Sequence, residues 1–419
     1  MKKTAPIYYF SLTDEMLRED KLNWFASTKF EDIPFERIEP DKNYNWLNIT
    51  DNDFDALLVL ADKKSKNTVF NLNNPGVSTN RDLWVYDLRK SHLVEKINYT
   101  IQTYNSLLTA GNSHFPELIK WSHVLKRKFS AHKKFNFSSK NITYSYYRPF
   151  FKVFYYCDLE LSDLLTDLHF LTYGKNLQQD NFVINFTGPN SQKPFMVLAN
   201  NHVSDLHFVG AAAATQCLPL YRYDSEGNRT DNITDWGLKQ FRTHYQDDTI
   251  TKENIFHYTY AVLHHPAYRE KYALNLKREF PRLPFYEDFS QWVTWGKQLM
   301  NLHLNYEQAK KYTLKRVDIE TNQLNKPRLK VDKEAGKIYL DTVTTLQGIP
   351  SIAWDYKLGN RSALEWILDQ YKEKKPRDKT IAEKFNTYRF TDYKIAVIDL
   401  LQRVCTVSVE TMKIIDKMP

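Results

Sequence analysis

The stretch ITYSYYRPFFKVFYY, residues 142–156, marks a change in the pattern of the chain. β-Branched and aromatic residues dominate it, a composition typical of half-buried strands. Three further runs of this kind follow, each bounded by turn residues: FVINF (182–186), PFMVLAN (194–200) and LPLYRY (218–223). Together these runs predict a β-rich centre.

Helical patterns flank this centre on both sides. From about Asp82 to Ser130, apolar residues recur three and four apart, which predicts helices. Helices are predicted again across 252–309 and from Ser362 onward, with an interruption near Pro376. Between them, strands are predicted at 312–320, 328–332 and 337–345, with a hairpin turn at 334–336. We therefore predict an α+β fold, in which a central mixed β-rich part is flanked by helical segments.

Length and composition narrow the class of protein. A chain of 419 residues is too long for one compact core, so two or three domains are expected. The three cysteines lie far apart and never form CxxC, which argues against a disulfide scaffold or a thiolate zinc site. The first ten residues lack an apolar signal-peptide core, and the apolar run around 209–214 is too short for a membrane span. We expect a soluble, cytoplasmic protein with no membrane partner.

Positive charge is concentrated in one segment. The net charge is +8, and no acidic residue occurs between Glu117 and Asp158. That acid-free stretch, residues 118–157, holds nine lysines and arginines interleaved with twelve aromatic residues. Outside it, basic and acidic residues nearly balance. Cations neutralise backbone phosphates and release counterions, so the stretch favours nucleic-acid contact over the alternative of a solvated face on an aromatic core.

A second segment is polar without being charged. Between Asp180 and Asp205 there is no acidic residue and a single cation, but many Asn, Gln, Ser and Thr side chains. Amide side chains of this kind pair with base edges in the major groove, adenine especially. The turn at 188–191 should be exposed between two strands. Polar loops are common, so the segment alone is weak evidence for base contact. The neighbouring basic stretch strengthens that interpretation.

Three histidines in FHYTYAVLHHPAYREKY, residues 256–272, suggest a metal site at first sight. Proline starts helices and disfavours helical conformation in the preceding residue, so one helix should end near His264 and another begin at Pro266. His257 and His264 would share one helix face, but no HExxH motif or third ligand accompanies them. We predict that these rings pack and hydrogen-bond at a helix junction.

The sequence lacks the common catalytic motifs. The sequence has no GxxxxGK[ST] loop, no GxGxxG and no GxSxG. Residues 73–76, NNPG, lack the second proline and the aromatic residue of an adenine-methyltransferase tetrapeptide. Glu373-Lys374-Lys375, a nuclease-like fragment, lies in a charged run that we interpret as a solvated linker. We predict no catalytic residue and no metal ligand in this chain, which disfavours an autonomous enzyme.

Several stretches resemble the C-terminal target-recognition region of type ISP single-polypeptide restriction–modification enzymes, which are related to type IIG-like enzymes. They are Leu17-Arg18-Glu19, Lys21-Leu22, Pro40-Asp41, Trp46-Leu47, GVSTNRDLWVYD (76–87), Tyr104-Asn105, YRPF (147–150), LPLYRY (218–223), YTYAVLHHPAYREKY (258–272), FPRLPF (280–285), LHL (302–304) and ALEWILDQY (363–371). They keep the family's order over nearly the whole chain. One departure is Leu218, where the family more often has Phe.

The resemblance implies a division of the chain and a set of companions. It implies an α/β and helical connector after a methyltransferase core (1–135), a β-rich target-recognition part (136–250), a helical segment (251–310), a β segment completing recognition (311–360) and a final helical part (361–419). Nuclease, helicase-like ATPase and N6-adenine methyltransferase domains would lie upstream, in the same or a companion polypeptide. S-adenosylmethionine, ATP and Mg²⁺ would belong to those parts, and this chain would need no cofactor of its own.

In such an enzyme the target base is flipped from the stack, while phosphate contacts position the duplex and base contacts specify the site. The candidates for phosphate contact are Arg81, Lys126, Arg127, Lys128, Lys133, Lys134, Lys140 and Arg148. The candidates for base contact are Asn190, Gln192, Asn200 and Asn201. Arg81 and Arg148 could instead be buried arginines paired with carboxylates such as Asp82 or Asp158. The rival functions are an autonomous nuclease or DNA-modifying enzyme, and an RNA-binding or scaffold protein.

Overall fold

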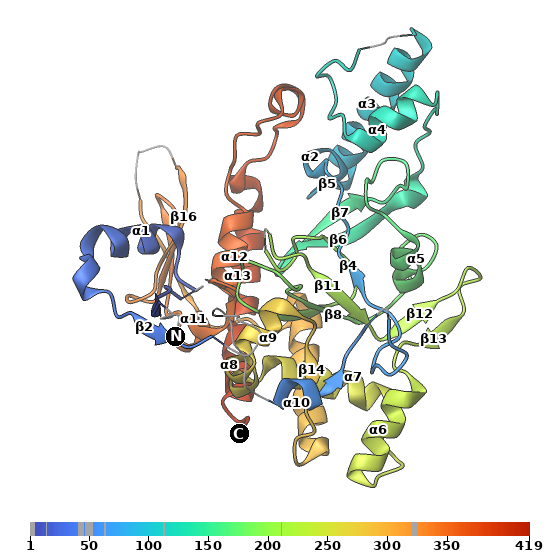
Figure 1. The fold of residues 1–419 in the computed structure, drawn as a ribbon. Helices are drawn as coiled ribbons and strands as arrows, with labels where there is room; N and C mark the ends of the chain where they lie inside the picture. The colour runs from blue at the N-terminus through green and yellow to red at the C-terminus, as the bar shows by residue number, and fades with distance from the viewer. Residues whose placement is uncertain are drawn as a thin grey trace.

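The computed structural model describes residues 5–13, 15–40, 46, 53–62, 64–111, 114–210, 212–320 and 325–419. Over these residues, helices and small sheets are interspersed along the chain, which confirms the predicted α+β fold (Figure 1). Three hydrophobic clusters form the interior of the described part. No helix in the described ranges is long and apolar enough to cross a membrane.

The predicted strands at 142–156 form a hairpin. β6 (Ile142–Arg148) and β7 (Phe151–Tyr156) pair antiparallel, with Ile142 opposite Tyr156. β5 (Tyr86–Asp87) extends the sheet beyond β7, and β10 (Val203–Ser204) lies parallel to β6 on the other side. This four-stranded sheet therefore brings residues 86–87 and 203–204 to either side of the hairpin.

A second four-stranded sheet holds the polar segment. Its order is β4-β11-β8-β9, all antiparallel. The strands are β4 (Asn74–Pro75), β11 (Gln216–Pro219), β8 (Val183–Phe186) and β9 (Val197–Asn200). Every residue of β8 and β9 is buried, as expected for strands covered on both faces. The loop between β8 and β9 contains the predicted turn at 188–191.

The third four-stranded sheet contains the strands predicted at 312–320, 328–332 and 337–345, the last of which is divided into two strands. Its order is β15-β18-β17-β16, again antiparallel. The strands are β15 (Lys315–Asp318), β16 (Pro327–Asp332), β17 (Lys337–Asp341) and β18 (Thr344–Gln347). The predicted hairpin turn at 334–336 connects β16 to β17.

Two-stranded pairings complete the described strands. They are β1 (Ile7–Tyr9) with β2 (Glu36–Ile38), β3 (Leu58–Val59) with β14 (Arg282–Leu283), β12 (Tyr221–Tyr223) with β13 (Arg229–Asp231), and β19 (Lys357–Leu358) with β20 (Arg361–Ser362). The β3–β14 pair joins residues more than two hundred positions apart, which ties an early segment of the chain to its centre.

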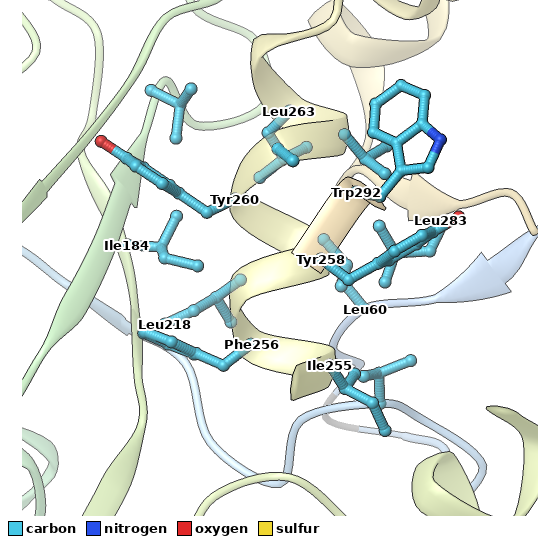
Figure 2. Close-up of a cluster of buried hydrophobic side chains, with 14 of the residues drawn as sticks. Leu60, Ile184, Leu218, Ile255, Phe256, Tyr258, Tyr260, Leu263, Leu283 and Trp292 are labelled. Atoms are coloured by element: carbon cyan, nitrogen blue, oxygen red, sulfur yellow. The ribbon is translucent and has the colours of Figure 1, made fainter. Parts of the chain in front are cut away.

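The first hydrophobic cluster surrounds the histidine-rich stretch. α7 (Lys252–His264) packs against α10 (Phe289–Leu304), and the residues of α7 from Ile255 onward are all buried. Figure 2 shows α7 between Ile184 and Leu218 of the second sheet and Leu283 and Trp292 on its other side. A Cβ atom placed on Gly296 of α10 would lie 1.9 Å from the His257 carbonyl oxygen, so the two helices touch through their backbones.

The predicted break at His265-Pro266 is confirmed. α7 ends at His264, and α8 (Pro266–Lys271) begins with the proline, followed by α9 (Ala273–Arg278). His264 donates its Nδ1 hydrogen to the Tyr260 carbonyl, 2.8 Å away, and His265 bonds the Pro419 carbonyl through Nε2. Among the residues that the structure describes, no group of three metal-ligating side chains is found. The histidines pack and hydrogen-bond at a helix junction, as predicted.

The second cluster is built around the last long helix. α13 (Phe390–Ile415) packs against α10, α11 (Ile352–Asp355) and α12 (Ala363–Gln370). It contributes Val397, Leu401 and Val404 to this cluster, while Ile414 belongs to the first cluster. α13 therefore spans two hydrophobic cores.

The third cluster supports a lobe of helices. α2 (Asp82–Val85), α3 (Lys90–Thr109) and α4 (His123–Ser130) stand beyond the β6–β7 hairpin (Figure 1). The remaining described helices are α1 (Arg18–Ser27), α5 (Asp167–Tyr173) and α6 (Asp235–Tyr245), with single turns η1 (Phe30–Asp32), η2 (Asp53–Ala56), η3 (Ser139–Asn141), η4 (Tyr306–Gln308) and η5 (Ile381–Phe385). We call α2, α3 and α4 the helical lobe.

Buried histidines make the fold sensitive to acid. His303 of α10 is fully enclosed: the Tyr260 hydroxyl lies 2.5 Å from its Nδ1, and Thr411 Oγ1 lies 2.9 Å from its Nε2. Burial lowers the pKa of His303 from 6.5 to about 3, because the charged ring would lose its hydration. The unfolded chain therefore binds this proton more readily than the folded chain does.

We expect the contribution of the neutral His303 ring to the free energy of unfolding to be complete above pH 6.5. This contribution is lost progressively as the pH drops from 6.5 toward 3. At one pH unit below 6.5, His303 alone should account for about 1.4 kcal/mol. Urea unfolding at pH 7.5 and 5.5 measures the loss. His303→Asn should shrink the difference between the two pH values by about that amount; an unchanged difference would mean that His303 does not titrate in this way.

Candidate nucleic-acid interface

Most aromatic residues of the acid-free stretch are buried or half-buried, and Tyr144 is the exposed exception. Tyr104 of α3 stacks on Phe135, with ring centroids 4.4 Å apart, and meets Phe129 edge-on at 5.3 Å. Phe129, Phe135 and Tyr155 are buried in the third cluster. These rings are core residues that hold the lobe together. The cations of the same stretch consequently face outward or into polar pockets.

Two of the predicted cations are paired with one carboxylate. Lys128 lies 2.9 Å from Glu160 Oε2 and also donates to the carbonyls of Leu159 and Glu160. Lys133 pairs with the other oxygen of Glu160. Burial acts to raise the pKa of Glu160, but the hydrogen bonds from Lys133 and Lys128 outweigh it and lower the pKa. Lys128 in particular anchors α4 to the loop after β7.

Four other predicted cations are exposed: Lys126, Arg127, Lys134 and Lys140. Lys126 lies over the Phe115 ring, 4.9 Å from its centroid. No side-chain ion pair of these four is found with any described residue. Their charges are therefore available to an external anion. We call them the open cations.

The two predicted arginines are largely buried. Arg81 is 4% exposed, and its Nη2 lies 3.9 Å from Asp163 Oδ1. Burial lowers the pKa of Arg81 to about 10, with Asp163 opposing the shift. Arg148 pairs with Asp205 at 3.1 Å and lies over the Tyr147 ring. Buried pairing, the alternative left open by the sequence, describes both residues, although the partners are Asp163 and Asp205.

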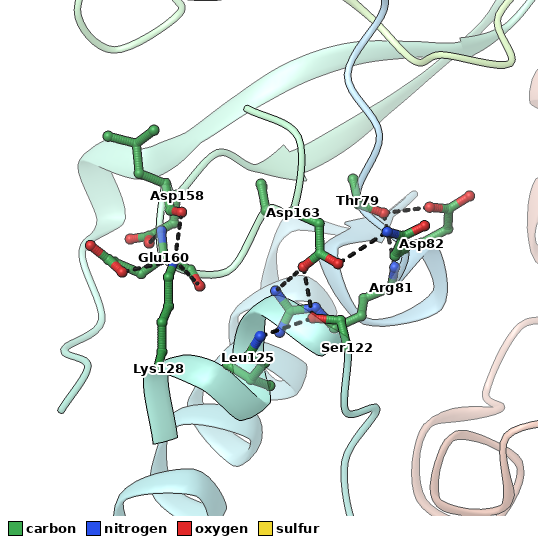
Figure 3. A network of polar contacts seen from close by, with 12 residues as sticks. Thr79, Arg81, Asp82, Ser122, Leu125, Lys128, Asp158, Glu160 and Asp163 are labelled. Atoms are coloured by element: carbon green, nitrogen blue, oxygen red, sulfur yellow. Dashed lines mark hydrogen bonds and ion pairs between the residues drawn. The ribbon is translucent and has the colours of Figure 1, made fainter. Parts of the chain in front are cut away.

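Figure 3 shows Asp163 at the centre of a polar network. It accepts a hydrogen bond from Ser122, which caps α4, and one from Asn80 at 3.0 Å. Thr79 bonds Asp82 on the other side of Arg81. The Thr79–Asp82 turn is thus fastened to the lobe by side chains from three segments.

The predicted base-contact residues divide between surface and interior. Asn190 and Gln192 are exposed in the β8–β9 loop, and Asn190 is held at φ 62° with its backbone N–H on the Lys277 carbonyl. Asn201 is half-buried beside Tyr146. Asn200 is 1% exposed, and its amide donates to Ser204 Oγ at 2.7 Å. In this arrangement three of the four side chains have an exposed surface.

A cavity of about 710 Å³ lies beside the Thr79–Asp82 turn. Gly76 allows the chain just before this turn to lie against the backbone of Asp205, because a Cβ at position 76 would lie 2.4 Å from the Asp205 carbonyl oxygen. The cavity wall includes the predicted residues Arg81 and Lys126. It also includes Lys120, Arg377 and Lys379, which were not among the predicted site residues.

Two of the missed residues, Arg377 and Lys379, come from a segment interpreted as a solvated linker. Residues 371–389 connect α12 to α13 and reach the helical lobe: Asp378 accepts a hydrogen bond from Trp84 Nε1 at 2.9 Å, and Phe385 packs on Trp84 and Tyr99. The signal in the sequence was the run KEKKPRDK, residues 372–379, which has five cations. Nothing local indicated that this run would fold back across the lobe.

A family model decides the relationship of this chain. The type ISP C-terminal specificity domain matches residues 68–400, which is most of the sequence. The chain belongs to this family. The resemblance seen in the sequence motifs is thereby confirmed. No curated protein sequence matches the chain.

Solved structures agree with the family. The chain is 43% identical to DrdV in the cryoEM structure of a DrdV–DNA complex, with a TM-score of 0.86 over 96% of this chain and 42% of that one. A nuclease-deletion mutant of the type ISP enzyme LlaGI, in complex with a DNA substrate mimic, is 28% identical, with a TM-score of 0.79 over 100% and 39% of the two chains.

The DNA-bound type ISP enzyme LlaBIII shares the fold at 24% identity, with a TM-score of 0.77 over 92% of this chain and 25% of that one. The chain therefore spans less than half the length of each of these three structures.

Proposed function

We propose that this chain recognises a specific duplex DNA target on behalf of an N6-adenine methyltransferase and restriction endonuclease of the type ISP kind. The observation that carries the proposal is the match to the type ISP specificity domain over residues 68–400. The likeness to the DrdV–DNA complex over nearly the whole chain supports it.

The open cations can supply the phosphate contacts that DNA binding requires. Phosphate contacts give affinity that does not depend on sequence, and base contacts select the site. Lys126, Arg127, Lys134 and Lys140 are exposed and free of carboxylate partners among the described residues. Asn190 and Gln192 of the β8–β9 loop are exposed amides that can bond base edges. We assign phosphate contact to the first group and base contact to the second, and also to Asn201, which is half-buried.

The catalytic steps would be carried out elsewhere. A nuclease, a helicase-like ATPase and a methyltransferase, in the same or a companion polypeptide, would supply them with S-adenosylmethionine, ATP and Mg²⁺. Methylation of the host target and cleavage of unmodified phage DNA would then both depend on the site read by this chain. A cytoplasmic location follows from that role.

The test is selection from a pool of randomised duplexes with the purified chain. We expect one sequence to be enriched, and the selected duplex to be retained against single-stranded DNA and RNA competitors. Incubation with S-adenosylmethionine, and separately with Mg²⁺ and ATP, should leave the DNA unmethylated and uncut.

Each rival function predicts a different result. Better competition by single strands than by duplex would favour an RNA-binding or scaffold protein. Methylated adenine or cut DNA from a preparation free of host enzymes would favour an autonomous DNA-modifying enzyme. Failure to enrich any duplex sequence would overturn the proposal.

A further inference from the structure

Arg81 has hydrogen-bonding capacity that the protein does not use. Its side chain lines the cavity beside the Thr79–Asp82 turn and is 4% exposed. Its Nε is buried without a hydrogen-bond partner among the described residues, and its ion pair with Asp163, at 3.9 Å, is longer than a hydrogen bond. A buried donor left unpaired costs free energy, so such donors normally have a partner, which can be a ligand.

The carboxylates of the cavity have partners within the protein. Asp82 accepts from the Tyr147 hydroxyl at 2.9 Å and from Thr79. Asp205 pairs with Arg148 and accepts the His207 N–H at 2.8 Å. Asp378 accepts from Trp84 Nε1. Glu117 is exposed on the rim, 3.7 Å from Lys379. These acids are therefore largely neutralised or hydrogen-bonded.

The cations of the cavity present the opposite picture. Lys120, Lys126 and Arg377 are exposed on its rim and have no carboxylate partner within the described ranges. Donors thus remain free on the wall of the cavity while acceptors are occupied, which favours an anion as its ligand. Trp121, which is half-buried, also lines the cavity and adds apolar surface beside these donors.

We propose that this cavity binds a phosphodiester group of one DNA strand and fixes the register of the duplex on the chain. The inference rests on the proposed DNA recognition and adds a site to it. The phosphate would accept hydrogen bonds from Arg81 inside and from Lys126 and Arg377 at the rim. Because the three residues come from three separate segments, the contact can form only when the 371–389 loop lies against the helical lobe.

The experiment tests which phosphate of the duplex depends on which side chain of the protein for binding. Each phosphate of the selected duplex is replaced in turn by a neutral methylphosphonate, and binding to the full chain is measured. We expect one position, or two adjacent ones, at which the parent loses about tenfold in affinity. The double variant Lys126→Ala with Arg377→Ala should bind the unmodified duplex more weakly than the parent does. Replacing the phosphate at that position should then weaken its binding little further. Arg81→Lys, which keeps the charge without the planar fork, should behave in the same way.

A charge-matched control is Lys90→Ala with Lys375→Ala, exposed cations of the helical lobe and of the 371–389 segment that lie outside the cavity wall. It should still lose about tenfold at the coupled position. Should Arg81→Lys fail to fold, the Lys126 and Arg377 pair decides alone. Equal losses for cavity and control variants at every phosphate would overturn the cavity site while leaving DNA recognition intact. Absence of any selected duplex would overturn the proposed function instead.

Discussion

Gly296→Ala is expected to destabilise the protein by about 3 kcal/mol, a large share of a typical folding free energy. The added Cβ would lie 1.9 Å from the His257 carbonyl oxygen, so α7 and α10 would have to separate. That separation would loosen the first hydrophobic cluster, in which α7 is buried on every side. Urea unfolding followed by tryptophan fluorescence and circular dichroism measures the loss.

The adjacent residue gives the matched control. Lys297→Ala lies on the same helix, is exposed, and should change the free energy of unfolding by no more than about 0.5 kcal/mol. Alanine is intrinsically the better helix former by about 1 kcal/mol, so helix propensity alone would make Gly296→Ala stabilising. A Gly296→Ala variant as stable as the parent would show that the two helices do not touch as described.

Changing the four open cations to alanine should remove most of the affinity for duplex DNA that does not depend on sequence. Each lost phosphate contact lowers the salt-dependence slope by about 0.9, so four contacts lower it by about 3.6. At 0.1 M salt this corresponds to a loss of about 3.6 orders of magnitude, because counterion release contributes little near 1 M. A salt titration of binding to a random-sequence duplex gives both values.

Net charge alone could produce part of this effect, so the control removes equal charge elsewhere. Lys239, Lys297, Lys310 and Arg328 are exposed on two helices, a loop and a strand outside the helical lobe. Changing these four to alanine should leave the slope nearly unchanged. Equal slopes for the two quadruple variants would show that the loss of affinity comes from the net charge of the protein. The open cations would then not contact DNA phosphates.

The secondary structure was predicted well where the chemistry is local. Strand runs such as 142–156 are rich in β-branched and aromatic residues, and the His265-Pro266 break follows from proline itself. The fold class was predicted from the order of strand and helix patterns, and the family from motifs such as GVSTNRDLWVYD. These features depend on residues close together in sequence.

The details of the site depend on contacts between distant segments, which the sequence does not display. Glu160 lies just beyond the acid-free stretch, and only the folded lobe brings it to Lys128 and Lys133. The partners of Arg81 and Arg148 lie more than fifty residues away. Arg377 entered the site because Asp378 bonds Trp84, nearly three hundred residues earlier. The DNA contacts of individual residues stay predictions.

The place of α13 in two hydrophobic cores has a consequence for biosynthesis. Residues 390–404 complete the second cluster and Ile414 joins the first, so neither is finished when the preceding strands and helices leave the ribosome. The earlier segments therefore keep apolar surface exposed to solvent until about residue 415 has left the ribosome. Ribosome-bound nascent chains shorter than this should therefore be captured by chaperones and cut readily by proteases, although most of their sequence has already been made.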